Sequence, residues 1–220
     1  VDLLETLNCQ IYKIPSPEIN HIPLLEKVAK TKKNIISSTG LATERDLDLA
    51  IKTIRSCGNN KILITKCTTS YPAPYKELNL KMISYYKKRY NCMVGYSDHT
   101  IDDVASICAI NSGAQLIEKH VCLDNVRSVD DFFSLRKKNF KNYISKLRAS
   151  EDCQGKIIRK ITSSAKKHIL GKRSIYISKN LKKGDKLSTS NIKIVRPSFG
   201  LHPKFFKKII GKRINRSLSL

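Results

Sequence analysis

The sequence lacks several features that would place a protein in a class at once. Its 220 residues contain no tryptophan and two methionines, and 18 acidic residues stand against 42 lysines and arginines. No apolar run approaches the length of roughly 18 residues that spans a bilayer. Residues 1–5 show no basic segment followed by an apolar one. We therefore expect neither a membrane-spanning helix nor a secretory signal.

Paired cysteines are also missing. The seven cysteines are dispersed along the chain and form no C-x-x-C motif. Such a set is typical of free, buried thiols in a reducing compartment, so we expect a cytoplasmic protein.

The excess of positive charge has two interpretations. A net charge of +24 is compatible with nucleic-acid binding. Here, however, the excess is rich in lysine, spread along the chain and accompanied by no nucleic-acid-binding motif. We expect solvated lysine-rich faces and no nucleic-acid partner, with a basic nucleic-acid-binding protein as the alternative. A positive field would also attract an anionic substrate.

Short β-rich runs alternate with helical segments in the first two thirds of the chain. Because the runs recur at the spacing of one β/α unit, they predict a parallel sheet with helices outside it. A (β/α)8 barrel and a doubly wound sheet both fit this order. Polar residues at the C-terminal end of every run favour the barrel, where all those ends meet at one mouth. The predicted strands are 11–14, 34–37, 61–65, 93–96 and 115–118, and the predicted helices are 22–31, 43–57, 78–90, 101–111 and 140–147.

The composition changes after residue 150. We predict that residues 1–150 form the barrel portion and that the Lys-, Arg- and Ser-rich residues 151–172 form a linker. Residues 173–220 then form a small β-rich module, with strands over 173–177 and 192–195.

Two histidines stand at equivalent ends of consecutive predicted strands. His99 and His120 are 21 residues apart, which is one β/α unit. Adjacent barrel strands would bring both imidazoles to one mouth, where they suit a divalent metal with positions left for water and substrate oxygens. A structural hydrogen-bonding role is the alternative, and we assign that role to His21 and His168.

Anion-binding groups accompany these histidines. Residues 38–40 place two hydroxyls and a glycine between a strand and a helix, a junction that can hold an anion. Ser97 adds a hydroxyl, and Lys13 and Lys119 can add compact positive charge. A strand-end lysine such as Lys119 also allows a Schiff-base aldolase as an alternative.

Several motifs together resemble one family, the sialic acid synthases, which are phosphoenolpyruvate-dependent synthases of nonulosonic acids. The matching segments are residues 12–18, 36–40, 66–74, 95–100 and 117–120, with Arg196-Pro197 and residues 200–203 near the end. The resemblance implies a (β/α)8 barrel followed by a small antifreeze-like, or SAF, domain. It also implies a cytoplasmic carbon–carbon bond-forming transferase.

The resemblance further implies roles for individual residues. His99 and His120 would bind Mn²⁺ or Mg²⁺, and Glu18 would transfer a proton. Tyr71, Asp130 and Glu18 would face an acetamido-deoxy sugar, and Arg196 would reach that sugar from the SAF domain of a second subunit in a swapped homodimer. The residues that would surround phosphoenolpyruvate are Lys13, Ser16, Ser38, Thr69 and Ser97.

Residues 128–135 resemble the corresponding segment of pseudaminic acid synthases, with N-acetylneuraminate synthase as the alternative. Compared with the family, we expect the chain to be shortened at both ends and to hold the last five barrel strands, with one sheet edge exposed. A synthase completed by residues outside this chain and a non-catalytic fragment are therefore both compatible with the sequence.

Overall fold

Five parallel strands in sequential order form the centre of the first part of the protein. The computed structural model describes residues 1–220, which divide into two units, Val1–Lys156 and Ile157–Leu220. In the first unit the strand order is β1-β2-β3-β4-β5. A doubly wound sheet reverses its order at a switch point, whereas a barrel does not. The order therefore confirms the predicted partial (β/α)8 barrel. The strands are β1 (Ile11–Ile14), β2 (Asn34–Ser38), β3 (Ile62–Cys67), β4 (Met93–Asp98) and β5 (Ile117–Lys119).

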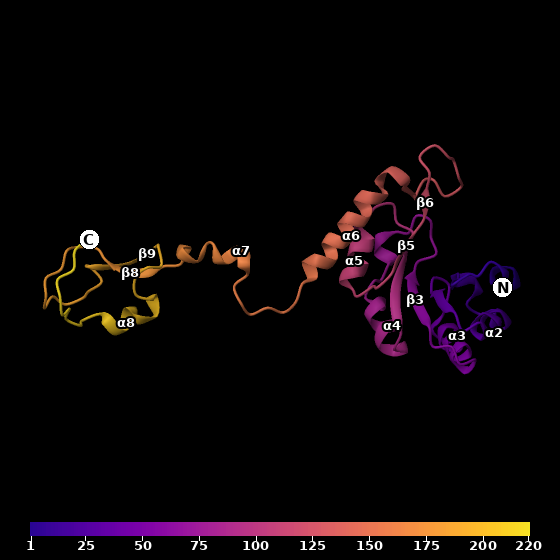
Figure 1. The fold of residues 1–220 in the computed structure, drawn as a ribbon, viewed down its shortest axis with the longest axis horizontal. Helices are drawn as coiled ribbons and strands as arrows, with labels where there is room; N and C mark the ends of the chain where they lie inside the picture. Colours follow the sequence, from indigo (N-terminus) through magenta and orange to yellow (C-terminus); the bar gives the residue numbers. More distant parts are fainter. The chain divides into compact units, whose positions relative to one another are not determined.

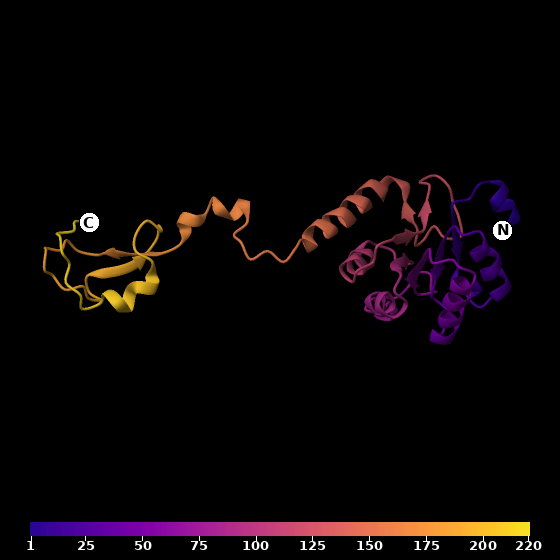
Figure 2. The same cartoon turned by 60° about the horizontal axis from the view of Figure 1, so that its bottom comes forward.

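Helices connect the strands and pack on one face of the sheet (Figure 1). Figure 2 shows α4 and α5 nearly end-on, with α6 running beside α5. The last helix continues to Gln154 rather than ending near residue 147, because Tyr143, Leu147 and Ser150 keep one helical face buried. No helix of the protein is both long and apolar enough to cross a membrane. The helices of this unit are α1 (Asp2–Thr6), α2 (Ile22–Lys30), α3 (Glu44–Ser56), α4 (Met82–Tyr90), α5 (Val104–Asn111) and α6 (Phe140–Gln154).

The two faces of the sheet have different chemistry because side chains alternate along each strand. The face toward the helices is apolar, and Ile14, Ile35 and Ile64 pack there against side chains such as Leu25 of α2 and Leu47 of α3. The start of α3 is set by a capping box, in which the Thr43 hydroxyl and the Asp46 carboxylate each bond the other residue's backbone N–H. The opposite face carries polar side chains at the C-terminal ends of the strands.

An ion pair across this inner face demonstrates that the sheet is strongly curved. Lys13 of β1 and Glu118 of β5 lie on the first and last strands, yet Lys13 Nζ is 3.0 Å from Glu118 Oε1. In a flat sheet these strands would be about 19 Å apart, which is beyond the combined reach of the two side chains. The five strands therefore form an arc whose inner face closes around a mouth.

A short excursion follows β5 directly. Strand β6 (Val121–Cys122) pairs in parallel with β7 (Leu135–Arg136), so residues 123–134 form a loop that leaves the strand ends and returns to them. This loop supplies Asp130 and the buried Phe133 to the neighbourhood of His120.

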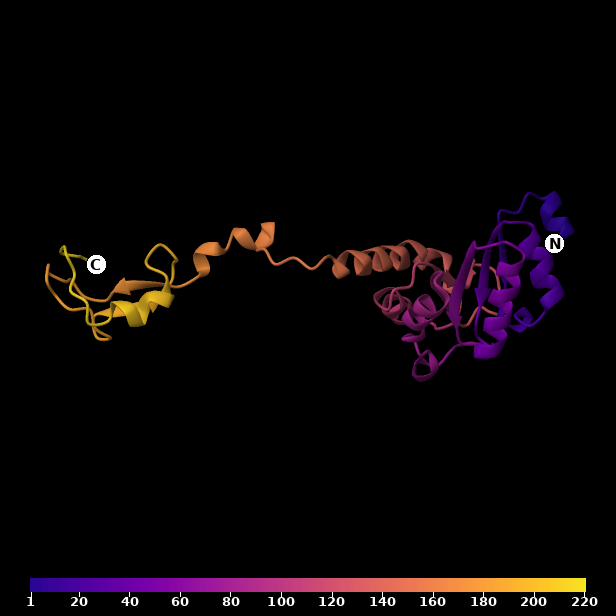
Figure 3. The same ribbon diagram turned by 90° about the horizontal axis from the view of Figure 1, so that it is seen from below.

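The second unit is built on two antiparallel strands, β8 (Ser174–Ile177) and β9 (Ile192–Val195). Figure 3 shows α8 (Phe206–Ile209) beside these strands. Gly200 passes close to β8, and a Cβ there would lie 2.6 Å from the Ile175 carbonyl oxygen. The unit also contains the short helix α7 (Ser163–Lys166), which lies within the segment predicted as a linker.

Candidate active site

The C-terminal ends of the strands bring together hydroxyls, one lysine and two imidazoles. Lys13 Nζ donates to Glu118 Oε1, which also accepts a hydrogen bond from Ser97 Oγ at 3.0 Å. In the turn after β1, Ser16 Oγ lies 3.1 Å from Thr69 Oγ1. Within this mouth, charge is therefore concentrated in Lys13, Glu118 and the groups around the histidines.

Gly40 is required where these hydroxyls converge. A Cβ at this position would overlap Thr69 Oγ1 and would lie 3.0 Å from Ser16 Oγ. The neighbouring Ser38 hydroxyl is buried and lies 2.8 Å from Thr65 Oγ1 on the next strand. The glycine thus lets the loop after β2 approach the loop after β3, which keeps the hydroxyls in one cluster.

His99 follows β4 and is buried, with 4% of its surface exposed. Its Nδ1 lies 2.8 Å from the Thr68 carbonyl oxygen. Because a carbonyl oxygen can only accept, Nδ1 carries the hydrogen and Nε2 presents a lone pair toward Ser97 Oγ, 3.4 Å away. Burial lowers the pKa of His99 below its usual value, which favours the neutral, ligating form.

His120 follows β5 and is held by a carboxylate. Its Nδ1 lies 3.1 Å from Asp130 Oδ2, so that a proton on Nδ1 is donated to Asp130 and Nε2 carries the lone pair. The rings of His99 and His120 are perpendicular, with centroids 5.3 Å apart. Both histidines therefore offer Nε2 from neighbouring strand ends, while Nδ1 is engaged elsewhere.

Two aromatic side chains enclose the histidines. The Tyr71 ring lies 4.3 Å from His99 and 5.8 Å from His120, measured between ring centroids. Phe133 is 1% exposed and lies 4.9 Å from His120. Phe133 lies within residues 128–135, but the sequence of that segment indicated only the identity of the sugar and no contact with a histidine. Its packing against His120 depends on the returning loop.

The donor set fits a divalent cation with two protein ligands. Imidazole is a good ligand for such ions, and an Nδ1 bonded to a carbonyl or carboxylate is the usual support for a ligating Nε2. No cluster of three or more His, Cys, Asp or Glu side chains suited to a metal occurs in the protein. A cation held by His99 and His120 would therefore keep positions for water and substrate oxygens.

Lys119 was wrongly predicted to face the mouth. It points to the opposite side of the sheet from Glu118 and His120 because side chains alternate along the chain. There Lys119 Nζ lies 3.1 Å from Asp98 Oδ2, and the Lys119 side chain is 4% exposed. This buried ion pair removes both the anion-binding role and the Schiff-base alternative for Lys119.

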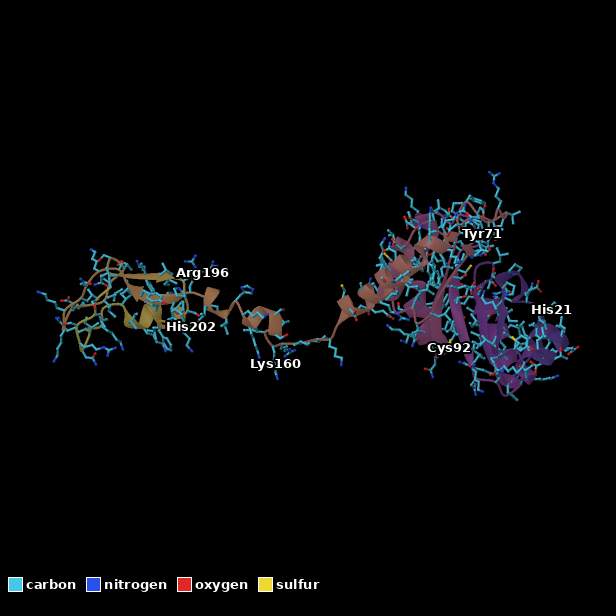
Figure 4. All side chains as sticks on the ribbon, turned by 45° about the horizontal axis from the view of Figure 1, so that its top comes forward. His21, Tyr71, Cys92, Lys160, Arg196 and His202 are labelled. Carbon is cyan, nitrogen blue, oxygen red and sulfur yellow. The ribbon has the colours of Figure 1, made fainter.

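The remaining predicted residues lie in three places. Glu18 ends the short 3-10 helix Ser16–Glu18 after β1 and is half-buried. Arg196 follows β9 in the second unit and is exposed; Figure 4 labels it with His202. His21 caps α2 by accepting from the Leu24 backbone N–H, as expected for a structural histidine. All seven cysteines are free, but of these only Cys67 and Cys122 are buried as predicted; Cys9, Cys57 and Cys92 are half-buried and Cys108 and Cys153 are exposed.

A separate cavity of about 710 Å³ opens at the other end of the strands. Its lining includes Ile36, Leu63, Met93 and Cys92. In Figure 4, Cys92 and Tyr71 lie at opposite ends of the sheet. The lining contains no carboxylate, histidine or hydroxyl, so the mouth with the histidines is the better candidate for chemistry.

A partial (β/α)8 barrel with hydroxyls and histidines at its mouth, followed by a small β-rich unit, defines the class of protein. The sequence profile of the NeuB family matches residues 1–159, and that of the SAF domain matches residues 172–219. The chain belongs to the NeuB family, which confirms its resemblance to the sialic acid synthases.

Individual relatives agree with this assignment. A pseudaminic acid synthase of Campylobacter jejuni is 37% identical over 219 residues, covering 99% of this chain and 64% of that protein. An N,N'-diacetyllegionaminic acid synthase of the same species is also 37% identical, covering 96% of this chain and 65% of that protein. The crystal structure of the spore coat polysaccharide biosynthesis protein SpsE of Bacillus subtilis superposes with a TM-score of 0.67 at 33% identity, covering 99% of this chain and 67% of that one. The chain thus spans about two thirds of the length of these relatives.

Proposed function

We propose that this chain serves a synthase that condenses phosphoenolpyruvate with an acetamido sugar to a nonulosonic acid and releases phosphate. The pairing of His99 with His120 supports this proposal most strongly. The centroids of their rings lie 5.3 Å apart at one mouth, and each Nδ1 is engaged by an acceptor, so that Nε2 carries the lone pair.

We propose Mn²⁺ or Mg²⁺ as the bound cation. When bound, such a cation supplies Lewis-acid polarisation of the sugar carbonyl oxygen. The protein's part is to hold the two imidazoles in place, through the Thr68 carbonyl for His99 and the Asp130 carboxylate for His120.

Phosphoenolpyruvate carries a carboxylate and a phosphate, and the mouth offers groups of matching chemistry. Lys13 supplies the positive charge, and hydroxyls supply hydrogen bonds around it. Because Lys13 pairs with Glu118 in the structure, a bound anion would compete with Glu118 for the ammonium group. The proposed hydroxyl groups are those of Ser16, Ser38, Thr69 and Ser97.

The proposed reaction forms one carbon–carbon bond, adds one carbon–oxygen bond from water and breaks the carbon–oxygen bond to phosphate. The methylene carbon of phosphoenolpyruvate attacks the aldehyde carbon of the open-chain sugar, and water adds to the carbon that bears the phosphate. Cleavage of the C–O bond then releases phosphate. We assign to Glu18 the transfer of a proton to or from the water or the sugar oxygen, a role that a carboxylate can fill.

The sugar would be held by groups on the outer rim. Tyr71 and Asp130 lie beside the histidines. Asp130 Oδ2 contacts His120, so Asp130 Oδ1 is the oxygen that would bind the sugar. Arg196 would come from the partner in a swapped homodimer. Residues 128–135 favour the precursor of pseudaminic acid, while the equal identities to pseudaminic and legionaminic acid synthases do not separate these two sugars.

The test is phosphate release from the purified chain with Mn²⁺, phosphoenolpyruvate and each candidate acetamido sugar in turn. Release that requires both substrates and stops on chelation supports the proposal. It should be lost in His99→Ala and His120→Ala and kept in His202→Ala, whose histidine caps a turn in the second unit. Full turnover by Glu18→Gln would show that the role of Glu18 is wrong.

The alternatives give different results in the same preparation. Binding of Mn²⁺ and phosphoenolpyruvate with no phosphate release identifies a non-catalytic fragment. Release with the precursor of N-acetylneuraminic acid alone identifies that synthase instead. Salt-sensitive retention on DNA or RNA, unaffected by Mn²⁺, identifies a nucleic-acid-binding protein.

A further inference from the structure

A buried ion pair lies directly behind the two histidines. Asp98 immediately precedes His99, and Lys119 immediately precedes His120. The two residues are register partners across β4 and β5. Lys119 Nζ lies 3.1 Å from Asp98 Oδ2, and the side chains are 4% and 0% exposed, respectively. The pair therefore joins the two strand ends at the positions next to the proposed metal ligands.

Each member of the pair is anchored further. Asp98 Oδ1 accepts from the backbone N–H and the hydroxyl of Thr100, both at 2.8 Å. Asp98 Oδ2 accepts from Ser106 Oγ of α5 at 2.6 Å, and Ser106 Oγ lies 2.7 Å from the Tyr143 hydroxyl of α6. Lys119 Nζ also donates to the Thr100 carbonyl oxygen. The network thus ties both strand ends to the helix layer.

The energetics of buried ion pairs favour a role for this pair in fixing local geometry rather than in adding stability. Removing two charges from water is costly, and a buried ion pair is often no more stabilising than a well-packed apolar pair. Its distinctive property is that it fixes one arrangement, because the carboxylate and the ammonium must meet with their other hydrogen bonds satisfied. Here that arrangement involves the two residues that immediately precede His99 and His120.

We infer that Asp98 and Lys119 are positioning residues that set the separation of His99 and His120 for cation binding. The inference rests on the proposed function. Neither side chain faces the mouth, so both act through the backbone of the adjacent histidine. A two-ligand site is sensitive to this spacing because ligand positions must hold to about 0.5 Å.

The experiment measures Mn²⁺ affinity of the full chain by calorimetry, without any activity assay. The test variant is Asp98→Asn/Lys119→Met, which removes both charges together and leaves neither unpaired. The matched control is Asp48→Asn/Arg89→Met, which removes another ion pair between two elements, at 2.8 Å on the surface of α3 and α4. We expect Mn²⁺ binding about 10- to 100-fold weaker in the test variant and unchanged in the control.

Two further measurements separate positioning from a loss of fold. Circular dichroism identifies the temperature range in which each variant is folded, and affinities are compared there. The visible spectrum of bound Co²⁺ reports coordination geometry and should change in the test variant only. If the double variant does not fold, Ser106→Ala keeps both charges but releases Asp98 from α5, and it should weaken Mn²⁺ binding beyond the spread of the control.

The outcomes distinguish this inference from the proposed function. Wild-type binding that depends on His99 and His120, with an unchanged affinity and Co²⁺ spectrum in a folded Asp98 or Ser106 variant, overturns the positioning role alone. Wild-type protein that binds no Mn²⁺, or binds it equally well without the histidines, overturns the metal site and the positioning role together. Weaker binding with an altered Co²⁺ spectrum supports both.

Discussion

The two units of this protein differ sharply in charge. Residues 1–156 hold 24 lysines and arginines and 17 acidic residues, whereas residues 157–220 hold 18 lysines and arginines and one acidic residue, Asp185. All the ion pairs of the protein lie in the first unit, from Lys27–Asp2 to Arg148–Glu151. The excess positive charge of the whole chain therefore lies mostly in its second unit.

The units differ in their cores as well. The first has three apolar clusters of buried residues, with Ile64, Val94 and Ala109 fully buried. The apolar side chains buried in the second are Ile175, Leu181 and Ile192. A large core can support a polar, partly charged mouth, because burial elsewhere offsets the cost of bringing such groups together. This contrast explains why the proposed chemical groups, apart from Arg196, lie in the first unit.

Loss of either mouth histidine should have the largest effect. If His99 and His120 are the two protein ligands, as proposed, His99→Ala or His120→Ala should weaken Mn²⁺ binding more than about 100-fold, because the remaining ligand cannot hold the ion alone. Calorimetry on the full chain measures this. His202→Ala in the second unit is the control, and an equal loss there would break the assignment of metal binding to the first unit.

A core truncation should reveal whether the units unfold separately. Ile64→Ala removes a fully buried side chain of the first unit and should cost about 2–5 kcal/mol there. Thermal unfolding by calorimetry should show one transition moving and the other staying in place. Ile192→Ala is the counterpart in the second unit, and a single transition shifted by both variants would contradict two independent units.

Replacing the carboxylate behind His120 should have a smaller effect. Asp130→Asn keeps an acceptor for the Nδ1 hydrogen but removes the negative charge, so Mn²⁺ binding should weaken by about tenfold. Asp131→Asn is the neighbouring control, since Asp131 contacts Arg136 rather than a histidine. Equal Mn²⁺ affinities for these two variants would show that the Asp130 carboxylate does not support the site.

Added salt should give the smallest effect and should act mainly on the second unit. Raising NaCl from about 0.1 to 1 M shortens the screening length from about 10 to 3 Å, which weakens repulsion among like charges. The thermal midpoint of the second unit should therefore rise more than that of the first. A Lys182→Gln/Lys183→Gln variant should reduce the rise, and an equal response of both units would count against the charge contrast.

Much of the fold follows from local patterns. Strands β1 and β9 occupy the predicted residues, and β2 to β5 and β8 differ from prediction only at their ends, because alternating β-rich runs are a local signal. The short strands β6 and β7 were not predicted. Helix α5 begins at Val104 rather than near residue 101. The Asp102 carboxylate accepts from the Val104 backbone N–H, and Lys119 holds the preceding carbonyls of Thr100 and Asp102. That start depends on a lysine 17 residues beyond Asp102 along the chain.

The sequence alone determined the order of β/α units, the family, and the presence of two histidines one unit apart. These properties follow from the spacing of residues along the chain, which can be read without knowing which distant residues are in contact. The tertiary structure decided which side chains meet: Lys13 with Glu118 across the arc, Asp130 with His120, and Lys119 with Asp98 behind the mouth. Sheet curvature and the alternation of side chains between the two faces set these contacts, because they place residues far apart in the chain within bonding distance or on opposite sides of the sheet.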